Sequence, residues 1–330
     1  MRIIKANAQI IRENDFPSKY SFIEYIGRTC YKSTDHMTEE SGMAFVKGLI
    51  KNKHLAMLEH SHIYLKTRLN TAHQIALTVN RYAIAPGKHI QMSYYGGVIG
   101  VEYISLSFRT VIELIDYCEE NGTIQMLVDV VARYYSNLFE GLYTPAKRIV
   151  EPDIYVLTRE QFVNDVTNTV KEEEIRDAIL RRHLTHTVLF TCDRGVSHEL
   201  VRHRVASFAQ ESTRYCNYAK DKFGNEIAVI EPCTLSPNSE AYTIWQKACI
   251  YAEKCYFALL DQGVKAQMAR DVLPTSLKTE IVVTASEDEW QHILNLRLKG
   301  TTGAPHPQMK EIMEIAYPLL HETTSGRLSI

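Results

Sequence analysis

The chain lacks several features that would assign it to a class of protein at once. Its 330 residues hold seven cysteines but no C-x-x-C pair, so neither a zinc site nor a disulfide framework is indicated. No uncharged apolar run approaches the ~18 residues that a membrane helix needs, and none resembles a signal peptide. Lys and Arg (37) nearly balance Asp and Glu (39), which excludes a global field for nucleic acid or membranes. We expect a soluble, cytoplasmic protein with reduced, mostly buried thiols and no bound metal.

Other absences concern the architecture. No G-x-G-x-x-G fingerprint is present, so a Rossmann turn is not expected to hold a dinucleotide. The chain also shows no internal repeat, low-complexity tract or Pro/Ser-rich linker. At this length, with 45% hydrophobic residues, one large domain and two ordinary domains are both possible.

Hydrophobic periodicity predicts a mixture of helices and strands. The 38–53 helix is expected to be capped by Thr38 or Ser41. The sequence SEDE at 286–289 predicts a capping box, in which Ser286 is the N-cap and the Glu289 side chain accepts a hydrogen bond from the Ser286 amide. Residues 144–170 show no clear period. Helices are expected over 38–53, 111–119, 123–138, 171–183, 242–259, 307–320 and from Ser286 onward, and strands over 63–69, 89–95, 101–108, 184–191 and 280–286, the second and third joined as a hairpin around Gly96, Gly97 and Gly100.

The stretch RHRVASFAQESTRYCNY, residues 202–218, places three basic side chains in a row. From Val196, apolar residues recur with a helical period to Phe208, so the stretch is expected to begin on or just after a helix. Consecutive helical residues are rotated by about 100 degrees, so Arg202, His203 and Arg204 must meet different partners.

Beyond Phe208 the order of residues suggests an extended segment with Gln210, Ser212 and Arg214 on one side. Such a row offers an amide, a hydroxyl and a guanidinium, which suit the polar ring and anionic tail of a nucleotide. Taken singly, each arginine is more typical of a surface ion pair than of a ligand contact.

The stretch resembles the signature of the flavin-dependent thymidylate synthases, R-H-R-x-x-S-x-x-x-x-S-x-R-Y. Four further segments are similar to elements of that family and occur in the same order. The signature matches at Arg202, His203, Arg204, Ser207, Ser212, Arg214 and Tyr215, and the other matches are HLAMLEH at 54–60, ARDVLP at 269–274, LNLR at 294–297 and HPQ at 306–308.

The chain also departs from the family's pattern. Glu199 stands where the family commonly has glutamine, and Gln210 stands where it has glutamate, so the exchange looks reciprocal. Ser286 replaces an asparagine cap, and Ala56 and Met57 replace a threonine and a proline. The matches cover roughly residues 20–66 and 183–320.

The resemblance implies an α+β fold with a mixed sheet flanked by helices. We expect residues 1–330 to form a single domain of this type, with 67–182 as an inserted α+β segment. The implied activity is reductive methylation of dUMP to dTMP, with FAD as cofactor and methylenetetrahydrofolate and NADPH as co-substrates. It further implies a homotetramer in which several subunits build each pocket.

The same resemblance implies roles for individual residues. Arg297 would activate the pyrimidine, and His54 would lie on the folate or nicotinamide side of the pocket. The residues expected to bind dUMP are Glu199, Arg202, Gln210, Glu211, Ser212, Thr213, Arg214, Arg270 and Arg297, and those expected to bind FAD are Arg202, His203, Arg204, Gln210, Ser286 and His292.

Alternative interpretations of these residues stay open. Arg297 is also compatible with a structural role, because a cationic side chain is favoured near the C-terminus of a helix. His54 is compatible with a buried, hydrogen-bonded histidine. Ser212 is compatible with a nucleophile that uses His203 as its base. For the whole chain, the alternatives are a single-stranded nucleic-acid-binding protein that uses residues 194–218, and a flavoprotein of the same fold without methylation activity.

Overall fold

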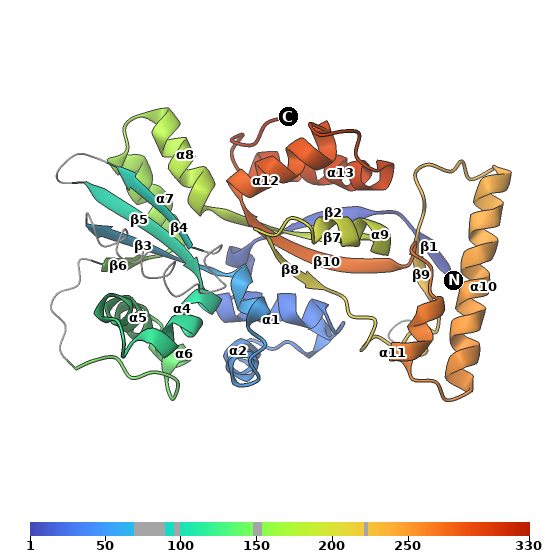
Figure 1. Ribbon diagram of the computed structural model, residues 1–330, viewed down its shortest axis with the longest axis horizontal. Helices are drawn as coiled ribbons and strands as arrows, with labels where there is room; N and C mark the ends of the chain where they lie inside the picture. Colours follow the sequence, from blue (N-terminus) through green and yellow to red (C-terminus); the bar gives the residue numbers. More distant parts are fainter. Residues whose placement is uncertain (69–89, 96–99, 148–153, 221–223) are drawn as a thin grey trace.

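The computed structural model describes residues 1–68, 90–95, 100–147, 154–220 and 224–330. Within these residues it is an α+β fold built around two four-stranded antiparallel sheets and a small two-stranded parallel sheet (Figure 1). The strands are β1 (Arg2–Ile4), β2 (Asn7–Ile11), β3 (His62–Arg68), β4 (Ile90–Tyr95), β5 (Val101–Ser107), β6 (Ile154–Leu157), β7 (Thr185–Asp193), β8 (Ser207–Gln210), β9 (Ala228–Ile230) and β10 (Lys278–Ser286).

Helices cover the sheets and fill the connections between strands. Short 3-10 helices add Glu13–Asp15, Thr34–His36, Leu55–His60, Ile115–Tyr117 and Arg270–Val272, and a π-helical turn spans Asn295–Lys299. The α-helices are α1 (Lys19–Thr29), α2 (Ser41–Lys51), α4 (Phe108–Leu114), α5 (Gly122–Tyr134), α6 (Ser136–Phe139), α7 (Arg159–Thr169), α8 (Glu173–His183), α9 (Arg194–Leu200), α10 (Glu240–Asp261), α11 (Ala266–Ala269), α12 (Glu287–Leu294) and α13 (Pro307–Thr323).

The central sheet has the strand order β2-β7-β10-β8. Side chains of a strand alternate between the two faces, and the apolar runs of β7 and β10 therefore supply both faces with core residues. On one face Ile281 and Val283 pack with Trp290 beneath α12 and α13, and on the other Val282 packs with Phe22 of α1. The sheet is thus covered on both sides, as Figure 1 shows.

The second sheet has the order β4-β5-β3-β6. Ile63 and Leu65 of β3 join the core formed with α4 and α5, while Tyr64 between them joins the core formed with α7 and α8. The small sheet pairs β1 with β9 and packs against the long helix α10. That helix, expected over 242–259, is followed by Gly263, whose φ of +79° suits glycine.

Several predicted boundaries are corrected by local capping. The 38–53 helix begins at Ser41, whose hydroxyl accepts from the Thr38 amide 2.9 Å away and donates to Glu24, so neither expected residue is its N-cap. The helices expected from 111 and 123 begin earlier, because Ser107 and Asn121 accept hydrogen bonds from the first-turn amides.

The helical period expected from Val196 to Phe208 is wrong beyond Leu200. Helix α9 ends at Leu200, and Val201 and Val205 are exposed. The chain then pairs with β10 as β8, so a tertiary strand ladder prevails over the local period. This arrangement agrees with the expectation that the basic stretch begins just after a helix.

The extended segment expected beyond Phe208 is also shorter than its alternation suggested, because β8 ends at Gln210. The Cys216 amide donates to the Ser212 carbonyl at 2.9 Å, which closes a turn directly after the strand. Gln210, Ser212 and Arg214 therefore do not form one row. The structure also assigns part of residues 144–170, where β6 precedes α7 and Thr158 and Gln161 form a capping box that the sequence T-x-x-Q signals.

The remaining expectations about helices, strands and cysteines are met or lie outside the described residues, while the division into one domain with an insertion stays a prediction. The cysteines are free, as expected. The other predicted helices and strands are present within a few residues of their expected bounds. Leu69, Gly96 and Gly97 belong to segments that the structure does not describe. In the described part of the chain, no helix combines the length and the apolar character that crossing a bilayer requires.

Candidate active site

The polar groups singled out in the sequence gather on the two faces of β10. Successive residues of a strand point to opposite faces. Lys278 and Glu280 therefore share the face of Val282, which packs against α1, while Ile281 and Val283 face α12. Two separate groups of residues result, which we name the Arg297 cluster and the Glu211 cluster.

The Arg297 cluster comprises Arg297, Glu199, His203, Glu289 and His292. Arg297 lies in the π-helical turn after α12 and donates from Nη1 to Glu199 Oε2 at 2.9 Å. Its Nε donates to His203 Nε2 at 3.1 Å. The cation is therefore held by a carboxylate on one side and an imidazole on the other.

Two helix caps bring these side chains together. Asp193 at the end of β7 accepts from the Val196 amide at 2.8 Å and starts α9, which carries Glu199. Ser286 at the end of β10 accepts from the Glu289 amide at 3.2 Å and starts α12. The predicted capping box is therefore only half formed. The Glu289 carboxylate does not accept from the Ser286 amide, because it lies 3.7 Å from His203 Nδ1 instead.

The three basic residues after α9 point in different directions, as expected. His203 is buried, with 6% of its surface exposed, whereas Arg202 and Arg204 are exposed. A guanidinium Nε always donates, so His203 Nε2 must accept from it, and the ring proton of a neutral His203 must then reside on Nδ1. The expected FAD contact of His203 therefore competes with a contact that the chain already makes.

His203, Glu289 and His292 each place a possible ligand atom within 4.8 Å of the others. This spacing suits a divalent cation. However, His203 Nε2 already accepts from Arg297, and Nδ1 bears the ring proton, so neither nitrogen of this ring offers a lone pair to a metal. We therefore do not assign the three residues as metal ligands, and the absence of a metal stays a prediction.

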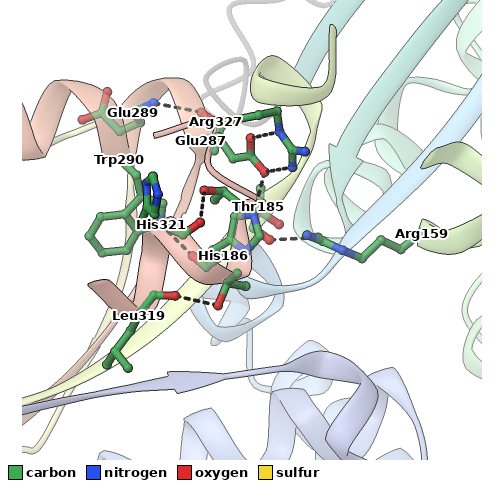
Figure 2. A network of polar contacts seen from close by, with 12 residues as sticks. Arg159, Thr185, His186, Glu287, Glu289, Trp290, Leu319, His321 and Arg327 are labelled. Atoms are coloured by element: carbon green, nitrogen blue, oxygen red, sulfur yellow. Dashed lines mark hydrogen bonds and ion pairs between the residues drawn. The ribbon is translucent and has the colours of Figure 1, made fainter. Parts of the chain in front are cut away.

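The cap of α12 rests on a buried ionic network (Figure 2). Glu287 is fully buried and accepts two hydrogen bonds from Arg327, at 2.8 and 2.7 Å. His186 Nε2 lies 2.8 Å from the same carboxylate. Burial alone would raise the pKa of Glu287, but the hydrogen bonds from Arg327 and His186 lower it overall. This network fixes the start of α12 and thereby the place of Glu289 and Arg297.

The Glu211 cluster comprises Glu211, Lys278, Glu280 and Lys32. Lys278 Nζ donates to Glu211 at 2.9 Å and to Glu280 at 2.8 Å, and Lys32 pairs with Glu280. Burial alone would raise the pKa of Glu280, yet Lys278 and Lys32 together lower it. A hollow of about 490 Å³ opens beside these four residues.

The two clusters lie on opposite faces of the central sheet. Lys278 and Glu280 share the face of Val282, which packs against α1, whereas Arg297 follows α12 on the other face. Gln210 belongs to the α12 face, where its Nε2 donates to Ser197 Oγ at 2.8 Å and to Thr279 Oγ1 at 3.2 Å. No recorded contact joins it to Glu199.

The remaining predicted nucleotide contacts lie near the Glu211 cluster. The Ser212 amide donates to the Cys30 carbonyl at the end of α1, at 2.9 Å. Arg270 Nη1 donates to Thr213 Oγ1 at 3.1 Å. The Arg214 guanidinium is exposed and lies over the Tyr215 ring. The predicted dUMP-binding residues are thus divided between the two clusters within one chain.

His54 joins neither cluster. Its side chain is exposed just before the 3-10 helix Leu55–His60, so the alternative of a buried histidine is wrong. The same segment nevertheless reaches β10, because His60 Nδ1 is hydrogen-bonded to Thr284 Oγ1 at 2.7 Å. Glu59 pairs with Arg109 of α4.

Sequence reasoning missed several residues that belong to the two clusters or contact them. Lys278 and Glu280 had a usable signal, because alternate residues of a strand share a face. Arg194, which donates to the Glu211 carbonyl at 3.1 Å, and Lys32 had none, because their partners lie far away in the sequence. Glu289 was noticed only as a cap residue.

Comparison with known proteins gives consistent similarities. Residues 157–325 match the family described as thymidylate synthase complementing protein. A flavin-dependent thymidylate synthase from Pyrococcus furiosus is 34% identical over 131 residues, which is 40% of this chain and 50% of that protein. The Geobacter sulfurreducens enzyme of the same name is 38% identical over 104 residues, 32% of this chain and 43% of the relative.

The chain thus spans about half the length of these relatives. The match to the family begins at residue 157, inside the expected insertion 67–182, so the limits of that insertion stay a prediction. Among solved structures, a UMP/dUMP methylase PolB from Streptomyces cacaoi is 22% identical and covers 51% of this chain and 90% of its own. Its TM-score of 0.37 is too low to support any argument.

Proposed function

The chain belongs to the thymidylate synthase complementing protein family, and on this premise we propose that it methylates dUMP reductively to dTMP. The proposed carbon donor is methylenetetrahydrofolate, and the proposed reductant is NADPH acting through FAD. The observation that carries the proposal is the Arg297 cluster, in which a cation from the family's L-x-L-R element meets the R-H-R element through His203.

The chemical problem is that C5 of uracil is a poor nucleophile. A fixed guanidinium beside the pyrimidine favours ionisation at N3 and moves electron density toward C5. Arg297 suits this role because its position is set by two partners, Glu199 and His203. When bound, reduced FAD would supply the hydride that completes the methyl group.

We assign the remaining side chains either to the phosphate or to the pyrimidine of dUMP. In the proposal, Arg214 and Arg270 hold the phosphate, because a guanidinium can grip an oxyanion with two hydrogen bonds. Ser212 and Thr213 add hydroxyl groups, and Glu211 supports the loop through Lys278. Glu199, Gln210 and Arg202 would contact the pyrimidine side.

Several exposed basic side chains also suit an anionic dinucleotide. Arg202 and Arg204 are exposed on the loop after α9, and His292 is exposed on α12. Cationic side chains of this kind fit a pyrophosphate. We assign these residues to FAD, together with His203, Gln210 and the Ser286 cap, and we place His54 on the folate or nicotinamide side.

The separation of the two clusters supports a shared pocket. Because the Arg297 cluster and the Glu211 cluster lie on opposite faces of the central sheet, the sheet separates them within one chain. A homotetramer in which neighbouring subunits contribute different clusters would remove this difficulty. We propose this assembly, and a cytoplasmic location, as part of the same function.

The test is an assay of dTMP formation from dUMP in which methylenetetrahydrofolate, FAD and NADPH are omitted one at a time. We expect product only with the complete mixture, and a yellow purified protein. Yellow protein that makes no dTMP in the complete mixture would favour a flavoprotein of this fold without methylation activity.

The position of Arg214 over the exposed Tyr215 ring favours a second function, binding of single-stranded nucleic acid. Binding measurements at several salt concentrations separate the two functions. A steep loss of affinity for an oligonucleotide with added salt, together with no affinity for dUMP, would support a nucleic-acid-binding protein.

A further inference from the structure

His203 links Arg297 to α12. Its Nε2 accepts from Arg297 Nε at 3.1 Å, and its Nδ1 lies 3.7 Å from the Glu289 carboxylate. The nitrogen that faces Arg297 must be unprotonated, because a guanidinium has no lone pair to offer in return. The Nδ1–H of the neutral ring then points toward the carboxylate.

From this geometry we propose that His203 is a positioning residue for Arg297 and that its protonation switches the site off. The neutral ring with its proton on Nδ1 holds Arg297 in place, whereas the protonated ring releases it. The functional part of this inference rests on the proposed thymidylate synthesis, because it assumes that Arg297 acts on the pyrimidine.

Protonation of His203 removes the acceptor and places two like charges side by side. His203 is only 6% exposed, so bulk water screens this repulsion poorly. Arg297 would then lose its hydrogen bond to His203 and keep its hydrogen bond to Glu199.

The charged and titratable groups around His203 act in opposite directions. Arg297, on the π-helical turn, opposes a proton on the ring, while Glu289 on α12 favours it. His292, also on α12, has its ring centroid 5.9 Å away and opposes the proton when it is itself charged. Glu199 on α9 partly offsets the charge of Arg297.

The first experiment is a pH–rate profile of dTMP formation between pH 5 and 9. The wild-type rate should fall on the acid side. His203→Gln offers an amide oxygen to Arg297 but does not titrate, so its profile should lose this acid limb. His203→Ala offers no acceptor, and we expect a loss of about 10²-fold at every pH, since small misplacements have that effect.

Glu289 provides a second, graded variant. Glu289→Gln removes the anion that faces Nδ1 of the protonated ring, so the acid limb should move to lower pH than in the wild type. The matched control is Glu314→Gln on α13, where Glu314 is exposed and pairs with Lys310. Its profile should be that of the wild type. An acid limb that persists unchanged in His203→Gln overturns the inference.

A second measurement does not depend on turnover. Nitrogen-15 NMR of the histidine-labelled protein distinguishes a ring protonated on Nδ1 from one protonated on Nε2, and His203→Gln identifies the signal. We expect the Nδ1–H form at pH 8. The Nε2–H form would overturn the inference whatever the activity. An Nδ1–H ring in a protein that makes no dTMP would support the positioning contact and refute the proposed function alone.

Discussion

Arg297 and Glu199 form an ion pair of 2.9 Å although 98 positions separate them in the sequence. Arg297 also donates to His203, so the guanidinium is fixed in two directions. A side chain held in this way loses little freedom when a substrate arrives, which is what electrostatic stabilisation of a developing charge requires. The pair also shows that Glu199, where the family commonly has glutamine, places a carboxylate directly against this cation.

Arg297→Ala should fold and retain flavin but lower kcat for dTMP formation by about 10²- to 10³-fold, the usual cost of removing one stabilising donor. Arg297→Lys should recover little of this loss, because an ammonium does not reproduce the geometry of the guanidinium. Steady-state kinetics with Arg181→Ala as the control would measure the effect, since Arg181 pairs only at the surface with Asp288. Normal turnover by Arg297→Ala would remove this residue from the mechanism.

Replacing Cys192 and Cys216 together with alanine should leave the chemistry largely intact. Both thiols are buried, and burial raises the pKa of Cys192, which disfavours the nucleophilic thiolate. We expect each substitution to cost about 1 kcal/mol of stability. The measurements are dTMP formation and urea unfolding of the double variant. If a correctly folded double variant is completely inactive, a thiol nucleophile is indicated instead.

Arg327→Met should destabilise the protein by about 3–5 kcal/mol, because it leaves the buried Glu287 carboxylate without its main partner. Adding Glu287→Gln to this variant should recover part of the loss, since the buried charge is then gone. The control is Lys310→Met, which breaks an exposed pair with Glu314 and should cost less than about 1 kcal/mol. If Arg327→Met and Lys310→Met lower the free energy of unfolding equally in urea, the buried pair of Arg327 and Glu287 (Figure 2) does not stabilise the protein as proposed.

The stability of the protein should fall as the pH drops below about 6.5, the ordinary histidine pKa. Burial lowers the pKa of His183 to about 3, so between these values the unfolded chain binds a proton that the folded chain does not. The free energy of unfolding therefore decreases by up to about 1.4 kcal/mol per pH unit for this one group.

His183→Asn should flatten this dependence between pH 7 and pH 5. The asparagine amide can still meet the Ser105 hydroxyl, which lies 2.9 Å from His183 Nδ1 in the wild type. His36→Asn is the matched control, because His36 is exposed and should leave the slope unchanged. Urea unfolding at several pH values provides the measurement, and identical slopes for His183→Asn and the wild type would refute the assignment.

Much of the local structure was predictable from short-range patterns. The apolar runs of β7 and β10 and the long apolar stripe of α10 are properties of contiguous residues, so the existence and type of these elements follow from the sequence. The predicted elements were wrong where a local hydrophobic pattern competed with pairing to a strand far away in the sequence. Val201 and Val205 continue a helical period, but β8 pairs with β10 and leaves both side chains exposed.

The sequence by itself determined which chemical groups this protein carries, because the R-H-R element, the L-x-L-R arginine and the Ser286 cap are contiguous motifs. Only the tertiary structure decided which of them meet. Arg297 lies with Glu199 and His203 on the α12 face of the central sheet, while Glu211 pairs with Lys278 on the other face. The reason is physical: the order of residues specifies local conformation, but contacts across many positions depend on how strands pair and which face each side chain occupies.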